Sequence, residues 1–216
     1  MTVNHPYIIA INGGIGSGKS VVSRIVTAMG YPVYDCDARA RQLMDSSDEI
    51  KAAISADIHR ACIKDGLIDR AMLASIVFED KEKLAILNSI VHGAVREHFA
   101  SWAENQPGTV CFVETAILYQ SGMDTMVDEV WTVDAPLDLR IERVMKRNGL
   151  TREAVMSRIT TQDSYTPATP HPLVRLIIND ADTPLLPRLQ PPTSPPPPPP
   201  QPTPYPPKNT NLHQTQ

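Results

Sequence analysis

Two patterns of apolar positions alternate along the chain. Short runs in which nearly every residue is apolar predict strands that are covered on both faces. These runs lie at residues 7–11, 32–34, 110–113, 130–133 and 176–178. Apolar residues spaced three and four apart predict helices, which lie at residues 19–29, 38–44, 49–58, 69–78, 82–102 and 137–147. The alternation predicts an α/β fold with a parallel β-sheet core flanked by helices.

The stretch 46–104 departs from this alternation because its pattern is almost wholly helical. Its last part carries a single apolar stripe over several turns, formed by Leu84, Leu87, Val91, Val95, Phe99 and Trp102. We therefore expect residues 46–104 to form a helical insertion over one end of the sheet.

The composition changes sharply near Leu189. More than half of the 21 prolines follow Gln190, including an unbroken run at residues 195–200. Proline has no N–H group and cannot complete helix or sheet hydrogen bonds, so we expect a disordered, extended tail over residues 190–216. A ligand for a proline-binding module is the alternative interpretation of this tail. The folded domain is expected over residues 1–189.

Charge and cysteine content narrow the class of protein. The 216-residue chain has a formal net charge of −4 with dispersed basic residues, which predicts no nucleic-acid partner. Cys36, Cys62 and Cys111 lack the paired spacing of a zinc site or a disulfide framework, which indicates free thiols in a reducing compartment. No apolar run reaches the ~18 residues of a membrane span. We expect a cytoplasmic monomer that binds a small molecule and no membrane.

A glycine-rich segment, "INGGIGSGKS", links the first predicted strand to the first predicted helix. It matches G-x-x-x-x-G-K-[ST] through Gly13, Gly18, Lys19 and Ser20, in the strand-to-helix context that this motif requires. Glycines let the backbone N–H groups approach phosphate oxygens at the positive end of the helix. In such loops the lysine reaches the β- and γ-phosphates and the serine hydroxyl binds Mg²⁺. The segment predicts a nucleoside triphosphate site, and the chain contains neither the Asn-Lys-x-Asp nor the Asp-x-x-Gly element of GTPases.

Two carboxylates follow the second predicted strand, in "YPVYDCDARARQLM". Ligands of open α/β sheets bind past the carboxyl ends of strands, so Asp37 is a candidate base for an acceptor hydroxyl. Arg41, one helical turn later, is a candidate for binding an anionic part of the acceptor. The alternative for Asp37 is a helix N-cap, a position that its place at the strand-to-helix turn suits.

Several segments, in register, together resemble the dephospho-CoA kinase family. The segments are "GGIGSGKS", "VYDCDARARQLM", "KDGLIDRAMLASIVFED", "LNSIVHGAVREHF", "FVETAILYQSGMD", "VDAPLDLRIERVMKRNGLTREAVMSRI" and "IINDADTPLLP". The resemblance spans residues 7–162 and resumes at residues 177–187. It implies a P-loop kinase fold related to nucleoside-monophosphate kinases, with a helical substrate-binding insertion and a small lid at about residues 140–165. It also implies transfer of the ATP γ-phosphoryl group to the 3′-hydroxyl of dephospho-CoA.

The same resemblance implies roles for individual residues. The implied catalytic residues are Asp37 and Lys19, and Ser20 is the implied Mg²⁺ ligand. The implied ATP-binding residues are Gly13, Gly14, Ile15, Gly16, Ser17, Gly18, Lys19, Ser20, Val21, Arg143 and Arg147. The implied acceptor-binding residues are Asn12, Asp37, Arg41 and His92. Arg143 and Arg147 are four residues apart on a predicted helix, so they share one face.

The chain departs from the family pattern in several places. Asn12 and Val21 stand where threonine is usual, Gly93 replaces a proline, and Gln120 replaces an acid. Three prolines within residues 163–176 rule out the helix that follows the lid in the family, and the tail replaces its C-terminal helix. These departures keep two alternatives open: a catalytically impaired ATP-binding module, and a kinase for another hydroxyl acceptor.

Overall fold

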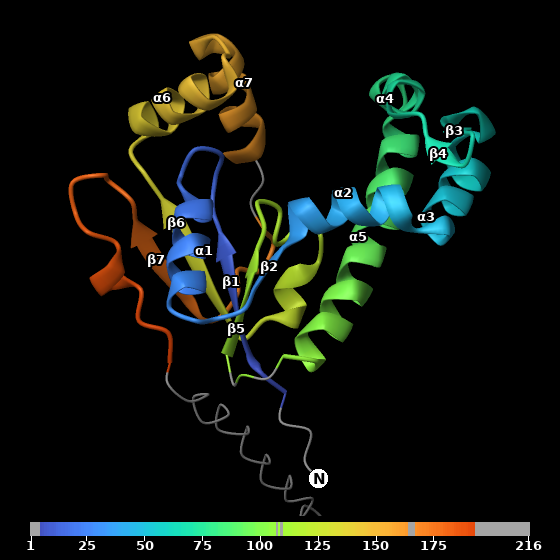
Figure 1. Ribbon diagram of the computed structural model, residues 1–216. Coiled ribbons are helices and arrows are strands. Elements are labelled where there is room, and N and C mark those ends of the chain that lie inside the picture. Colours follow the sequence, from blue (N-terminus) through green and yellow to red (C-terminus); the bar gives the residue numbers. More distant parts are fainter. Residues whose placement is uncertain (1–4, 107, 109, 164–166, 193–216) are drawn as a thin grey trace, which may run out of the picture.

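A five-stranded parallel sheet forms the core of the computed structural model, which describes residues 5–106, 108, 110–163 and 167–192 (Figure 1). Its strands are β1 (Tyr7–Asn12), β2 (Val33–Asp35), β5 (Val110–Glu114), β6 (Glu129–Asp134) and β7 (Val174–Ile178). They lie in the order β2-β5-β1-β6-β7, with every neighbouring pair parallel. The predicted α/β fold class, with a parallel sheet and flanking helices, is confirmed.

The two faces of the sheet bury different sets of side chains because side chains alternate along each strand. Ile8 and Ala10 of β1 pack toward α5, against Phe99. Ile9 and Ile11 pack on the other face in the cluster that contains α1 residues and Leu189. A strand with apolar residues on both faces is therefore sandwiched between helical layers, as its unbroken apolar sequence predicts.

Helices surround the sheet and extend beyond it as a separate helical lobe (Figure 1). The α-helices are α1 (Lys19–Ala28), α2 (Cys36–Ser46), α3 (Asp48–Ala53), α4 (Arg70–Glu79), α5 (Lys81–Glu104), α6 (Leu137–Asn148) and α7 (Arg152–Asp163). The lobe has its own apolar cluster around Ile50, Ile54, Ile58, Cys62 and Leu73. The short 3₁₀ helices are η2 (Arg60–Cys62), η3 (Met123–Met126) and η4 (Leu186–Arg188).

The lobe differs from the sequence prediction in two details. The predicted helix 49–58 is α3 followed by a π-helix, η1 (Ile54–Ile58), in which the His59 N–H donates to the Ile54 carbonyl. The wider turn keeps Ile50, Ile54 and Ile58, four residues apart, on one buried face. An unpredicted hairpin, β3 (Ile63–Lys64) and β4 (Leu67–Ile68), follows η2.

The chain after the lid is not helical. The helix α7 ends at Asp163, and within the described residues 167–192 the chain forms β7 and the single turn η4. This agrees with the prolines that were expected to prevent a helix there. The boundary between a folded domain at residues 1–189 and a disordered tail stays a prediction, because residues 193–216 lie outside the described part of the chain.

Candidate active site

A cavity of about 720 Å³ is lined by residues of the β1–α1 loop and of α6 and α7. Figure 1 shows this loop at the carboxyl ends of the parallel strands, beneath α6 and α7. The residues that line it come from the loop, α1, α2, β5, the lid helices and the end of β7. They are Ile15, Gly16, Gly18, Lys19, Ser20, Val21, Asp37, Glu114, Ala116, Arg143, Val144, Arg147, Arg158, Gln162 and Asn179. The volume lies in the range of small-molecule sites in proteins, ~300 to 1,000 Å³.

The glycine-rich loop wraps around the Lys19 ammonium group. Gly16 and Gly18 have φ angles of 79° and 97°, which a residue with a side chain adopts only with strain. The Lys19 Nζ atom donates to the carbonyl oxygens of Gly13 (2.8 Å) and Gly14 (3.3 Å). Lys19 is the first residue of α1, so the ammonium and the positive end of the helix favour the same anion.

Two carboxylates lie near this lysine, one at the end of β5 and one in the first turn of α2. Burial lowers the pKa of Lys19, while the negative charges of Glu114 and Asp37 oppose that shift. Glu114 is the last residue of β5, and burial raises the pKa of its carboxyl group. In the site, the negative charges of Glu114 and Asp37 therefore offset the positive charge of the buried Lys19 ammonium.

Asp37 lines two cavities, the larger one and a second, smaller one. The second, of about 90 Å³, adjoins α2 and α5. It is lined by Cys36, Asp37, Ala40, Val91, His92, Val95, Thr115, Ile117, Ser121 and Met123. Burial and the nearby charge of Arg96 lower the pKa of His92, so its imidazole is neutral at pH 7. The only residue shared by the two linings is the one predicted to be the base.

The alternative role for Asp37 as a helix cap is not what the structure shows. The N-cap of α2 is Asp35, whose side chain accepts a hydrogen bond from the Ala38 N–H at 2.9 Å. Asp37 is the second residue of the helix and lies in its first turn. Capping therefore does not engage the Asp37 carboxylate.

Side chains of the lid and of the end of β7 contact the loop. The Arg143 guanidinium donates to the carbonyls of Gly16 (3.3 Å), Ser17 (3.4 Å) and Asn179 (3.3 Å). The Asn179 side-chain amide donates to the Ser17 carbonyl at 2.8 Å. The Gln162 carbonyl oxygen accepts from the Ile15 N–H at 2.6 Å. The lid and the end of β7 thus hold the loop in place.

The remaining predicted residues occupy different positions around the site. Ser20 and Val21 are exposed at the mouth of the larger cavity, and Arg147 lines it. Gly13, Gly14 and Ser17 form the back of the loop, and Asn12 ends β1 just before it. Arg41 is exposed on α2 and lies outside the linings of both cavities. Its predicted contact with the acceptor stays a prediction.

Sequence reasoning missed four polar residues that line the larger cavity: Glu114, Arg158, Gln162 and Asn179. Glu114 and Asn179 each come directly at or after the end of an apolar strand. A polar residue in that position of a parallel sheet is a usable signal for a ligand site. Arg158 and Gln162 lie four apart on α7, a spacing that places both on one face.

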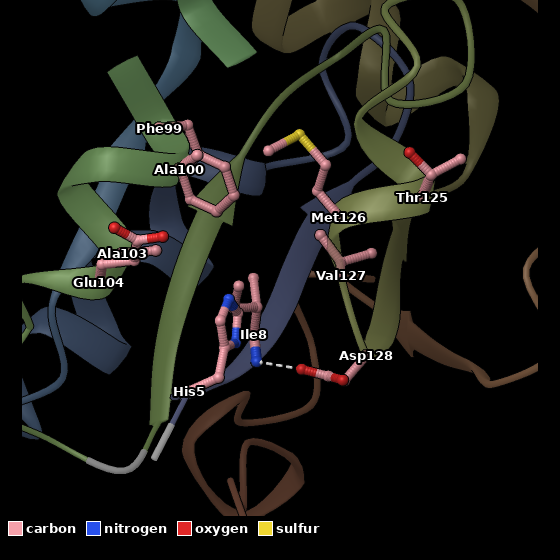
Figure 2. A pocket seen from close by; sticks show the side chains of 10 residues that line it. All are labelled: His5, Ile8, Phe99, Ala100, Ala103, Glu104, Thr125, Met126, Val127 and Asp128. Carbon is pink, nitrogen blue, oxygen red and sulfur yellow. Dashed lines mark hydrogen bonds between the residues drawn. The ribbon is translucent and has the colours of Figure 1, made fainter. Parts of the chain in front are cut away.

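A further cavity, of about 330 Å³, lies near the amino end of β1, away from the loop (Figure 2). His5, Ile8 and Asp128 are part of its lining, and the Asp128 carboxylate accepts from the Ile8 N–H at 2.7 Å. The glycine-rich loop does not contribute to it. It therefore cannot be the phosphate site.

A parallel sheet whose first strand passes through a glycine-rich loop into a helix, under a helical lid, defines a P-loop kinase. The family model described as dephospho-CoA kinase matches residues 7–174. The chain belongs to the dephospho-CoA kinase family.

Individual relatives agree with this assignment. The dephospho-CoA kinase of Porphyromonas gingivalis is 40% identical over 155 residues, which cover 72% of this chain and 77% of that protein. The dephospho-CoA kinase of Bacteroides fragilis is 34% identical over 182 residues, covering 84% of this chain and 88% of that protein. The crystal structure of TT1252 from Thermus thermophilus has a TM-score of 0.65 and 33% identity, covering 81% of this chain and 89% of that chain.

In the part of the chain that the structure describes, no helix combines the length and apolar character needed to cross a bilayer. Within the same residues, no group of three or more His, Cys, Asp or Glu side chains is arranged to hold a metal ion.

Proposed function

We propose that this chain is a dephospho-CoA kinase, which transfers the γ-phosphoryl group of ATP to the 3′-hydroxyl of dephospho-CoA and so gives coenzyme A. The observation that carries the proposal is the position of Asp37 between the two cavities. The larger cavity, on the glycine-rich loop, accommodates ATP. The smaller cavity, with His92 in its lining, is assigned to the reacting end of the acceptor, because about 90 Å³ is too small for the whole molecule.

Catalysis in this site comes from charge and position. The Lys19 ammonium and Arg147 neutralise the phosphate oxygens of the transferring group. The Asp37 carboxylate accepts the proton of the acceptor hydroxyl as that oxygen attacks the γ-phosphorus. Holding donor and acceptor on either side of Asp37 supplies the alignment that the reaction requires.

The donor set of this site fits Mg²⁺, a hard cation that prefers oxygen ligands. The exposed Ser20 hydroxyl and the carboxylates of Asp37 and Glu114 belong to the same cavity lining. Ser20 would hold the ion, with nucleotide phosphates as further ligands. When bound, the ion neutralises charge on those phosphates.

A coupled assay of ADP release tests the function, with dephospho-CoA, adenosine and shikimate as separate acceptors. We expect turnover with dephospho-CoA alone. ATP binding without turnover on any acceptor would favour an impaired ATP-binding module. Turnover only with another acceptor would favour a different small-molecule kinase.

Asp37→Asn tests the role of the carboxylate in the same assay. We expect turnover to fall by about 10² to 10⁴-fold with nearly unchanged ATP affinity, because only proton transfer is lost. Asp35→Asn is the matched control: it removes the same charge two residues away and keeps a residue type that caps helices well. Equal activity of Asp37→Asn and Asp35→Asn would exclude Asp37 as the base.

A further inference from the structure

Arg140 of α6 packs directly against the back of the glycine-rich loop. The residue is almost fully buried, at 8% exposure, and its Nε donates to the Ile15 carbonyl at 3.0 Å. A Cβ atom placed on Gly14 would come 2.2 Å from the Arg140 Nη2 atom. A Cβ atom on Gly16 would come 2.5 Å from the main-chain oxygen of Arg140. The absence of side chains at these two glycines is what allows α6 to approach.

The contact with the Ile15 carbonyl also fixes the orientation of the Gly16 N–H, because both groups belong to one peptide unit. In a trans peptide the C=O of one residue and the N–H of the next point in opposite directions. Because Arg140 draws the Ile15 carbonyl outward, the Gly16 N–H points the other way, toward the side of the loop that lines the nucleotide cavity. That is the side on which a phosphate oxygen can accept a hydrogen bond.

The preceding peptide unit is fixed as well. The Ile15 N–H donates to the Gln162 side-chain oxygen at 2.6 Å, and the Gly14 carbonyl accepts from the Ser17 N–H and from Lys19 Nζ. Both polar backbone groups of Ile15 are thus held by lid side chains, one from α6 and one from α7. The position of the lid and the conformation of the loop are coupled at this residue.

We infer that Arg140 is a positioning residue for the phosphoryl donor, which acts by holding the Ile15 carbonyl so that the Gly16 N–H faces the nucleotide. The inference rests on the proposed ATP-dependent function. Arg140 contacts the loop and lies outside the lining of the nucleotide cavity. It differs in this from Arg143 and Arg147, which line the cavity and are predicted to bind phosphate.

Arg140→Met in the full-length chain tests the inference, because methionine fills much of the space and removes the donor. We expect MgATP, titrated by calorimetry without acceptor, to bind about tenfold more weakly or worse, as expected for loss of a buried charged hydrogen bond. In steady state, the KM for ATP should rise by a similar factor while the KM for dephospho-CoA stays within about twofold. Arg152→Met is the matched control, since Arg152 lies on the lid helix α7 and is exposed in an ion pair with Asp138 at 2.6 Å. It should leave ATP affinity unchanged.

Arg140→Lys separates positioning from stability, because it keeps the charge and one donor. We expect it to recover part of the ATP affinity lost in Arg140→Met. Parent-like ATP affinity in Arg140→Met overturns the inference. An equal loss of affinity for both substrates, or no recovery in Arg140→Lys while its melting temperature matches the parent, overturns it as well.

Gly14→Ala disturbs the same contact from the side of the loop. This variant remains informative if Arg140→Met does not fold. Its Cβ would displace the guanidinium, so we expect weaker ATP binding in the parent and a smaller effect in the Arg140→Lys background. If Gly14→Ala weakened ATP binding by the same factor in the parent and in the Arg140→Lys background, the inference would be contradicted. The titration contains no acceptor, so this result is independent of whether dephospho-CoA is the substrate.

Discussion

Glu114 shows how a residue at the end of a strand sets the electrostatics of the site. Burial raises the pKa of its carboxyl group, and the nearby Asp35 and Asp37 charges add to this shift, while Lys19 opposes it. A carboxyl group whose pKa is higher in the folded than in the unfolded state binds its proton more tightly when folded. Its ionisation therefore destabilises the fold, by an amount that grows as the pH rises from the unfolded pKa, ~4.3, to the folded pKa.

Glu114→Gln removes this cost because glutamine stays neutral. We expect the variant to have a higher free energy of unfolding than the parent at pH 7.5, with a difference that shrinks as the pH is lowered to 5. Urea denaturation of the nucleotide-free protein at both pH values measures it. Glu142→Gln, an exposed residue of α6, is the control and should show little change at either pH. A Glu114→Gln variant less stable than the parent at pH 7.5 would contradict the assignment.

The predictability of the site differs between its residues. Lys19 and its loop could be predicted because their motif is local: the strand, the loop and the helix that shape the phosphate site are consecutive in sequence. Gln162 and Asn179 are more than 140 residues from the loop atoms that they contact. Only the strand order and the position of the lid bring them there. Arg140 carries no distinguishing signal in the sequence, since it is one of several arginines on α6.

At the scale of elements, strands and helices could be predicted where apolar residues recur with a regular period. The β3–β4 hairpin was missed although it carries a strong local signal, Asp65-Gly66. Both residues have positive φ angles, 52° and 75°, as a two-residue hairpin turn requires. The strands are two residues each, too short for an alternating pattern. The π-helix η1 could not be predicted because its sequence has the same apolar spacing as an α-helix.

Gly93 lies in the interior of α5, next to His92, and offers a test of local helix stability. A Cβ atom at this position meets no atom within 4 Å beyond its chain neighbours and the backbone of its own helix. Alanine loses less backbone entropy than glycine on folding, so Gly93→Ala should raise the free energy of unfolding by about 0.5 to 1 kcal/mol. Thermal and urea denaturation measure the change.

Gly149 is the matched control for that substitution. It caps α6 with a φ of 65°, and a Cβ there is also free of contacts within 4 Å. Gly149→Ala should therefore lower stability, by about 1 kcal/mol, through backbone strain alone. If both variants moved stability in the same direction, the helix-interior explanation for Gly93 would be wrong.

At the scale of the whole molecule, the sequence predicts a parallel sheet but not the order of its strands. β1 lies in the centre because the chain crosses to β2 and β5 on one side and later to β6 and β7 on the other. The path after β7 was also not predicted in detail. Leu185 and Leu189 return to the α1 face of the sheet and join its apolar cluster, and Arg175 donates to the carbonyls of Arg188 and Gln190.

These contacts indicate that the residues needed for a stable fold extend to about residue 192. Truncation of the chain tests this. A chain that stops after Pro192 keeps Leu189 and the Arg175 contacts, so we expect parent-like melting temperature and dephospho-CoA turnover. Leu189→Ala in the full-length chain removes a side chain with 0% exposure and should lower the free energy of unfolding by about 2 to 5 kcal/mol. Both variants are compared by thermal denaturation and by the coupled ADP assay. A truncated chain as unstable as Leu189→Ala would mean that residues 193–216 contribute to the fold and that the predicted disordered tail is wrong.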